Sequence, residues 1–129
     1  MENYRKRLLL PLFAFLVLIL GNVAMAQQPP GEEPPANVAG KWTIYSKGED
    51  GKTATQSIEV SQDGGTITGH FKGPNQSGGL EGTMNGRHIL FRTKTPEVLT
   101  FRGTFDGNSI EGTFDIRGKK GTWEARRPD

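Results

Sequence analysis

From Gly40 onward, apolar or small residues alternate with polar ones at a period of two. A period of two is typical of half-buried β-strands, whereas a helix would repeat every 3.6 residues. Turn signals rich in Gly, Asn and Asp separate the alternating runs. The pattern predicts eight strands and no helix of useful length, with strands at 40–46, 54–62, 65–72, 79–84, 87–93, 98–105, 110–116 and 121–127.

The turns predict how neighbouring strands pair. A two-residue turn at Asp63-Gly64, a second at Asn85-Gly86 and a four-residue turn at 106–109 keep the apolar residues of each hairpin on one face. These turns place Val60 opposite Ile67, Leu80 opposite Phe91, and Phe105 opposite Ile110. We therefore expect an all-β domain, a single eight-stranded antiparallel up-and-down meander closed into a small barrel.

Four glycines recur in the pattern apolar-x-Gly-x-apolar. The predicted register places Gly69 opposite Gly82 and Gly103 opposite Gly112, all facing inward. Glycine weakens a strand, and its usual purpose there is a sharp bend where a sheet closes. We assign the four glycines a structural role, while space for a ligand is the functional alternative.

The first residues predict export. A basic start at 4–7 precedes the apolar run Leu8 to Leu20, and Ala24-Met25-Ala26 forms a small-x-small peptidase site. This order is typical of a secretory signal peptide. We expect residues 1–26 to be removed after Ala26 and the protein to be secreted or periplasmic. An uncleaved membrane anchor is the alternative, but a spanning helix needs about 20 apolar residues and this run is shorter.

Cleavage also changes the charge and defines the domains. The signal carries three basic residues and only one acid, so the +2 charge of the whole chain falls to formal neutrality. General attraction to nucleic acid then loses its support. We expect a Pro-rich disordered linker at 27–38 and the barrel domain at 39–127. The chain has no cysteine, so its core alone must hold the fold.

Sixteen large residues have the inward parity. An eight-stranded barrel has an interior that side chains can just fill or that holds one small ligand. With this many large residues we expect a filled interior and a shallow site at one end. The inward set is Trp42, Ile44, Ile58, Val60, Ile67, Phe71, Leu80, Met84, Ile89, Phe91, Leu99, Phe101, Phe105, Ile110, Phe114 and Trp123.

Both ends of the domain resemble a known group. Gly40-Lys41-Trp42 opens the first strand, and the last strand contains Trp123 and Arg126. A G-x-W on strand one with an arginine on the final strand resembles the calycin group of lipocalin- and avidin-like barrels. The resemblance implies that Arg126 covers Trp42 at the closed end. The alternative is that Trp42 and Trp123 are core aromatics, with Arg126 paired to Glu111 across the outer face.

The residues offer no recognisable catalytic or metal chemistry. His70 and His88 are the only near-neutral bases and both have the outward parity. Two isolated histidines do not form a zinc site, and no nucleophile motif occurs. We expect no enzyme activity, no metal and no cofactor.

The longer connections, 47–53, 73–78, 94–97 and 117–120, all fall at one end of the meander, where a rigid scaffold usually carries its binding groups. We expect a small polar or anionic molecule to bind at this end. The predicted ligand-binding residues are Gln56, Asn75, Gln76, Lys94, Lys119 and Lys120.

The alternative function is a protein-interaction or inhibitor-like module with a filled barrel, contacting its partner through Pro96 and the 73–78 loop. The polar outer face excludes an outer-membrane barrel. After signal cleavage we expect no membrane or nucleic-acid partner and a monomeric protein.

Overall fold

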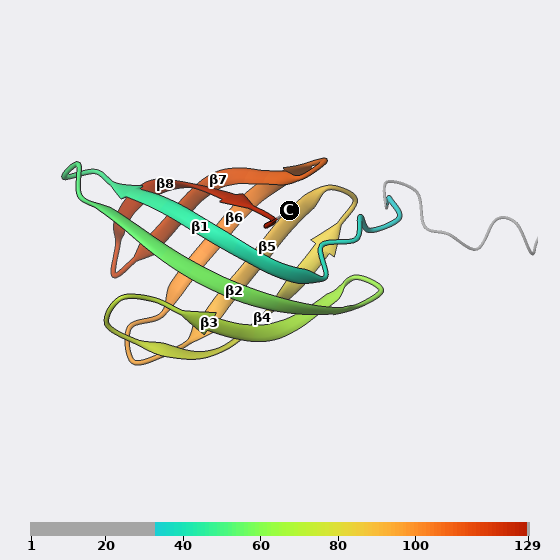
Figure 1. Ribbon diagram of the computed structural model, residues 1–129, viewed down its shortest axis with the longest axis horizontal. Coiled ribbons are helices and arrows are strands. Elements are labelled where there is room, and N and C mark those ends of the chain that lie inside the picture. Colours follow the sequence, from blue (N-terminus) through green and yellow to red (C-terminus); the bar gives the residue numbers. More distant parts are fainter. Residues whose placement is uncertain (1–32, 129) are drawn as a thin grey trace, which may run out of the picture. The chain divides into compact units, whose positions relative to one another are not determined.

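The computed structural model describes residues 33–128, and the predicted signal peptide and the first half of the predicted linker lie outside them. Eight strands follow one another in the chain (Figure 1). Their bounds are β1 Gly40–Gly48, β2 Thr53–Asp63, β3 Thr66–Lys72, β4 Ser77–Asn85, β5 His88–Lys94, β6 Leu99–Asp106, β7 Ser109–Ile116 and β8 Lys119–Arg126. Between residues 33 and 128, no helix is long and apolar enough to cross a membrane.

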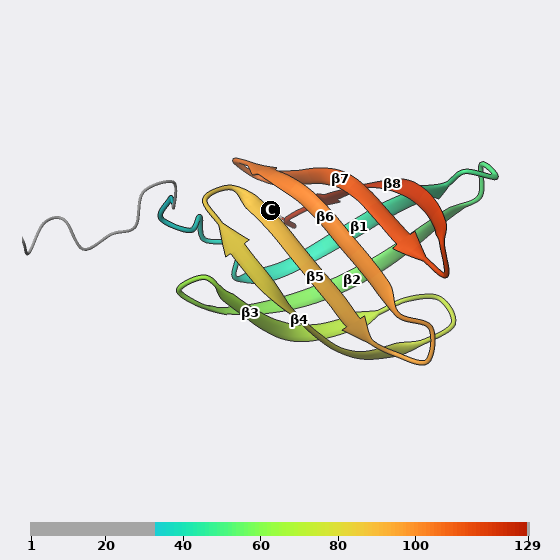
Figure 2. The same cartoon turned by 180° about the vertical axis from the view of Figure 1, so that it is seen from behind.

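Each strand pairs antiparallel with its neighbour in the chain, and β8 pairs back onto β1 (Figure 2). The predicted eight-stranded, closed up-and-down barrel is therefore confirmed, with every strand end within two residues of the expected position. Strict alternation is the cause, because each strand buries one row of side chains and leaves the other in water, as in the β2 pattern from Gln56 to Val60.

The predicted register of two hairpins is wrong by two residues. β2 and β3 pair Asp63 with Thr66, and β4 and β5 pair Asn85 with His88. Gly64 and Gly86 have φ angles of 60° and 58° and each occupies the first position of a two-residue turn. This is the type II′ arrangement, which places glycine first. The sequence had instead predicted Asp63-Gly64 and Asn85-Gly86 as the two central residues of these turns.

These shifts change the predicted partners. Val60 lies opposite Gly69, Leu80 opposite Thr93, and Gly82 opposite Ile67 and Phe91, so Gly69 and Gly82 do not face each other. The β6–β7 hairpin is as predicted, with Phe105 opposite Ile110 and Gly103 opposite Gly112. A shift of two residues conserves parity, so the predicted inward and outward faces are unaffected.

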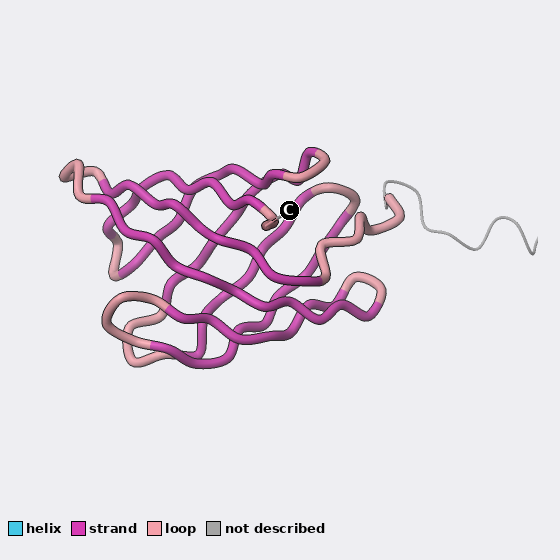
Figure 3. The backbone as a smooth tube through the Cα atoms, viewed as in Figure 1, coloured by secondary structure: helices cyan, strands magenta, loops and turns pink. Residues whose placement is uncertain are grey.

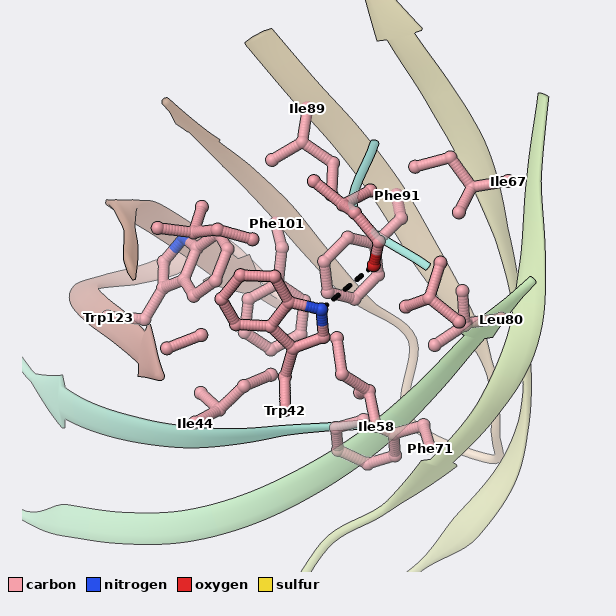
Figure 4. Packing of buried hydrophobic residues seen from close by; sticks show 14 of the residues in the cluster. Trp42, Ile44, Ile58, Ile67, Phe71, Leu80, Ile89, Phe91, Phe101 and Trp123 are labelled. Carbon is pink, nitrogen blue, oxygen red and sulfur yellow. Dashed lines mark hydrogen bonds between the residues drawn. The ribbon is translucent and has the colours of Figure 1, made fainter. Parts of the chain in front are cut away.

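Fourteen of the sixteen predicted inward residues are buried, and Phe105 and Phe114 pack partly buried against them. Phe91 and Phe101 stack with ring centroids 4.7 Å apart, and Trp123 meets Phe101 edge-on at 5.2 Å (Figure 4). Val38 and Ala125 are also fully buried. Most of the barrel interior is filled by side chains, as expected.

The inward glycines lie where neighbouring strands approach closely. A Cβ on Gly82 would overlap the carbonyl oxygen of Leu90, and one on Gly112 would overlap that of Arg102. At Gly103 a Cβ would stand 2.8 Å from Cζ2 of Trp123. Any side chain at these positions would push adjacent strands apart, so the glycines allow the tight coiling of a small barrel.

The end of the barrel that carries the tight turns is closed by residues 36–38. These residues were expected to belong to the solvated linker, yet Val38 is fully buried. Gln62 holds the segment, accepting from the Val38 amide at 2.8 Å and donating to the Ala36 carbonyl at 2.7 Å. Trp42 donates from Nε1 to the Val38 carbonyl at 2.9 Å (Figure 4).

The arginine that covers Trp42 is Arg127, not Arg126. The Arg127 guanidinium carbon lies 4.5 Å from the Trp42 ring centroid, and Nη2 donates to the Asn37 carbonyl at 2.6 Å. Arg126 lies opposite Thr43 and points outward, where it pairs with Glu124 and not with Glu111. Parity explains the correction, because inward Trp42 requires an inward partner and the inward position beyond Ala125 is 127.

Candidate functional site

The longer connections gather at the end opposite the tight turns (Figure 3). They comprise residues 49–52, 73–76 and 95–98. The β7–β8 connection had been expected to be long, but it is a two-residue turn with Ile116 opposite Lys119. Arg117 and Gly118 have φ angles of 54° and 78°, the left-handed pair of a type I′ turn.

A cavity of about 700 Å³ opens between these connections. Its volume lies within the range of about 300–1,000 Å³ typical of small-molecule sites. Residues from β1, β2, β3, β6, β7 and β8 form its walls. The lining is Ser46, Gly48, Glu49, Asp50, Lys52, Thr53, Ala54, Gln56, Phe71, Gly73, Pro74, Asn75, Gln76, Pro96, Glu97, Leu99, Phe114, Ile116, Gly118, Lys119 and Lys120.

The inner part of the cavity is apolar. Phe71 and Leu99 are buried, and Phe114 and Ile116 are partly buried against the core. The aromatic cluster around Phe101 fills the barrel beyond them. The site is therefore an open cup at one end and not a channel through the barrel.

Two polar residues of the lining, Ser46 and Gln56, are also buried, and Gln56 has the larger side chain. It is only 8% exposed, it lies opposite Ile44, and it alternates with the buried Ile58. Its Oε1 is buried and accepts no hydrogen bond from any residue between 33 and 128. A buried polar atom without a partner costs about 1–3 kcal/mol. A ligand that supplied a donor would remove this cost.

One side of the rim is held rigid by side-chain hydrogen bonds. The Gln76 carboxamide bonds both ways to the Glu97 backbone, with Nε2 to the carbonyl at 2.7 Å and Oε1 from the amide at 3.0 Å. Thr95 donates to the same carbonyl at 2.7 Å, and Thr93 accepts from the Leu99 amide at 2.9 Å. Loops 73–76 and 95–98 are thereby joined.

The charges of the site lie on the exposed outer rim. Glu49 accepts from the Lys120 amide at 2.8 Å, and Asp50 accepts from the Lys52 amide at 2.9 Å. Glu97 forms an ion pair with Arg117 at 3.5 Å. The ammonium groups of the lining lysines have no carboxylate within 4 Å among the described residues; these are Lys52, Lys119 and Lys120.

The structure brings five of the six predicted ligand-binding residues to the cavity. Gln56 lies on the inner wall, and Asn75, Gln76, Lys119 and Lys120 lie on the rim. The Gln76 amide is already engaged with Glu97. Lys94 does not line the cavity, because it points to the outer wall and pairs with Glu81 at 3.1 Å.

The predicted structural residues lie elsewhere. Trp42 and Trp123 are buried, Arg126 is on the outer wall, and none of the four glycines predicted to be structural lines the cavity.

Several lining residues were not predicted to belong to the site. Phe71, Leu99 and Phe114 had been assigned to the core, and nothing in an alternating pattern distinguishes a core residue from one that faces a cavity. Ser46 was detectable, because it follows Trp42 and Ile44 at the same parity and is buried. A run of inward residues that turns polar toward one strand end indicates where the interior becomes accessible.

No protein-family model and no curated protein matches the sequence. Solved structures match in fold. A redesigned β-barrel superposes with a TM-score of 0.65 at 17% identity, covering 71% of this chain and 92% of the other. A redesigned barrel, mFAP1, bound to DFHBI, gives 0.62 at 17% identity, covering 70% and 94%. A de novo designed fluorescence-activating β-barrel gives 0.52 at 23% identity, covering 70% and 93%. The chain shares its eight-stranded barrel fold with these proteins.

Proposed function

We propose that this protein is an exported, non-enzymatic barrel that binds a small molecule in the cup at its long-loop end. The observation that carries the proposal is the 700 Å³ cavity with Gln56 buried and unpartnered on its inner wall. The apolar lower wall would hold the body of the ligand, and the polar rim would orient its outer end. The mFAP1 barrel supports the proposal, because it has the same fold and its structure holds the small molecule DFHBI.

A calycin-like assignment accompanies this function. Trp42 on β1, covered by an arginine that follows the last strand, supports it, with the arginine at position 127. The same assignment favours binding over catalysis. His70 and His88 are exposed on the outer wall and do not line the cavity. The polar outer wall and the closed sheet favour a monomer.

Binding can be tested with 1-anilinonaphthalene-8-sulfonate, whose emission rises in apolar sites. We expect saturable binding at one site per protein. Ile116→Trp should weaken it at least tenfold, because the larger ring would enter the cavity from β7. Leu90→Trp is the matched control, since Leu90 lies on the outer wall opposite Thr83 and Arg102. Absence of saturable binding, or equal weakening in both variants, would contradict the proposal.

A protein partner is the second candidate. Val98 is 48% exposed and lies in the 95–98 loop beside Pro96, giving the rim an apolar point of contact. Val98→Ser would then weaken partner binding while leaving dye binding in the cup unchanged.

A further inference from the structure

One polar group on the inner wall of the cup has no hydrogen-bond partner among the described residues. The buried polar side chains of the described chain are Ser46, Gln56 and Thr93. Ser46 donates to the Ala54 carbonyl at 3.4 Å. Thr93 accepts from Leu99 and shares a 2.7 Å hydrogen bond with Thr95. Only Gln56 retains a buried oxygen without a partner on this side of the barrel.

The surroundings of Gln56 disfavour a charged ligand group beside this side chain. Its neighbours across and along the sheet are Ile44 and Ile58, and the buried residues of the cavity lining carry no charge, since they are Ser46, Gln56, Phe71 and Leu99. The cavity lysines stand on the exposed rim. A carboxylate carried down to Gln56 would lose its hydration and gain no cation, which is strongly unfavourable.

The Gln56 carboxamide itself determines which ligand group it can pair with. It offers an acceptor oxygen and a donor NH₂ group side by side, so it can pair with a second amide edge through two reciprocal hydrogen bonds. The terminal torsion of glutamine is broad, so rotation about it can present Oε1, which is buried in the free protein, to a ligand in the cavity. A lactam, a primary amide or a urea has such an edge, whereas a ketone, an ether or a carboxylate lacks the N–H donor.

We infer that the cup selects a neutral ligand carrying an amide edge, which binds Gln56 while an apolar body lies against Phe71, Leu99 and Phe114. The inference rests on the proposed function and refines it. The ligand would form its hydrogen bonds with Gln56 deep in the cup, away from the rim lysines. The selected molecule is therefore uncharged at its inner end. An anionic group, if present, would project outward to the rim.

Three compounds that share a benzene ring fused to a five-membered ring test this selection. Oxindole is a lactam, 2-indanone replaces its N–H by CH₂, and indane-2-carboxylate carries a charge. We expect NMR titrations to show oxindole binding about tenfold more tightly than 2-indanone, since 2-indanone has no N–H group to donate to the buried Gln56 oxygen. The carboxylate should bind least. Gln56→Leu should abolish the preference for oxindole, and the outward-facing Thr55→Val should retain it.

The outcomes separate the two proposals. If 2-indanone or the carboxylate binds as tightly as oxindole and shifts the signals of cavity residues, the cup is a binding site but the amide inference is wrong. If none of the three shifts the signals of cavity residues, both proposals are contradicted. A preference for oxindole that survives Gln56→Leu would also overturn the assignment to Gln56.

Discussion

Two glutamines of β2 point into the barrel, and they differ in whether their carboxamide oxygens are hydrogen-bonded. Gln62, at the closed end, has its carboxamide bonded to Val38, Ala36 and Gly64. Gln56, at the open end, has a buried oxygen without a partner. A satisfied buried amide stabilises a fold, and an unsatisfied one opposes it. Conflicts of the second kind are expected at functional positions, where binding compensates for the loss.

This contrast predicts opposite effects of the same substitution. Gln56→Leu should raise the free energy of unfolding by about 1 kcal/mol, because an unpaired amide is replaced by an apolar group. Gln62→Leu should lower it by about 1–3 kcal/mol, because the segment at 36–38 loses its hydrogen bonds. Urea denaturation of both variants measures the two values. A loss of stability in Gln56→Leu would show that its oxygen is satisfied in solution.

The neighbouring arginines form a second matched pair. Arg127→Ala should lower the free energy of unfolding by about 1–2 kcal/mol, through loss of the cation–π contact with Trp42 and of the packing of its aliphatic stem. Arg126→Ala should change it by less than about 0.5 kcal/mol, because its exposed ion pair with Glu124 contributes little. Thermal unfolding would refute this assignment if the two effects were exchanged.

At the scale of strands and turns, the close approach of neighbouring backbones limits which inward glycines can be replaced by a larger residue. Gly112→Ala places a methyl group against the Arg102 carbonyl of β6, and we expect a loss of about 3 kcal/mol or more. Gly79→Ala is the control, since its new Cβ would stand 3.6 Å from the Lys94 side chain, an ordinary contact. Denaturation midpoints compare the two, and equal midpoints would contradict this account of the inward glycines.

The joined rim loops give a further prediction. Gln76→Ala removes both hydrogen bonds to Glu97, so the Glu97 amide should exchange its hydrogen at least tenfold faster in deuterium oxide. Asn75→Ala, in the same loop, should leave that exchange rate unchanged. Mass spectrometry of peptides covering residues 94–99 measures this exchange rate. Unchanged exchange in Gln76→Ala would mean that the backbone alone holds the loop.

The turns also show how far the sequence could predict this structure. Alternation determined which side chains face inward, since that property depends on parity alone. It could not distinguish registers two residues apart, because both bury the same rows. The distinction depends on whether glycine stands first or second in the turn, as at Gly64 and Gly86. The cup was expected at the correct end, but its volume depends on side-chain packing that no local pattern encodes.

At the scale of the whole molecule, the proposed export predicts the form of the mature protein. Residues 1–26 should be removed, so protein recovered outside the cytoplasm should begin at Gln27 and carry no net formal charge. Intact-mass spectrometry measures this directly. Ala24→Arg should block processing, because the peptidase requires small residues, and the precursor mass should then persist. Recovery of the unprocessed wild-type chain from membranes would favour an anchor.

The pairing of β1 with β8 has a consequence for how the chain folds. The other seven pairings join consecutive strands and can form as local hairpins. The seam between β1 and β8 alone must bring together distant parts of the chain, so it bears most of the loop-closure entropy. Until it closes, two strand edges remain exposed to other copies. A newly synthesised chain is therefore most prone to aggregate in the interval before this seam closes.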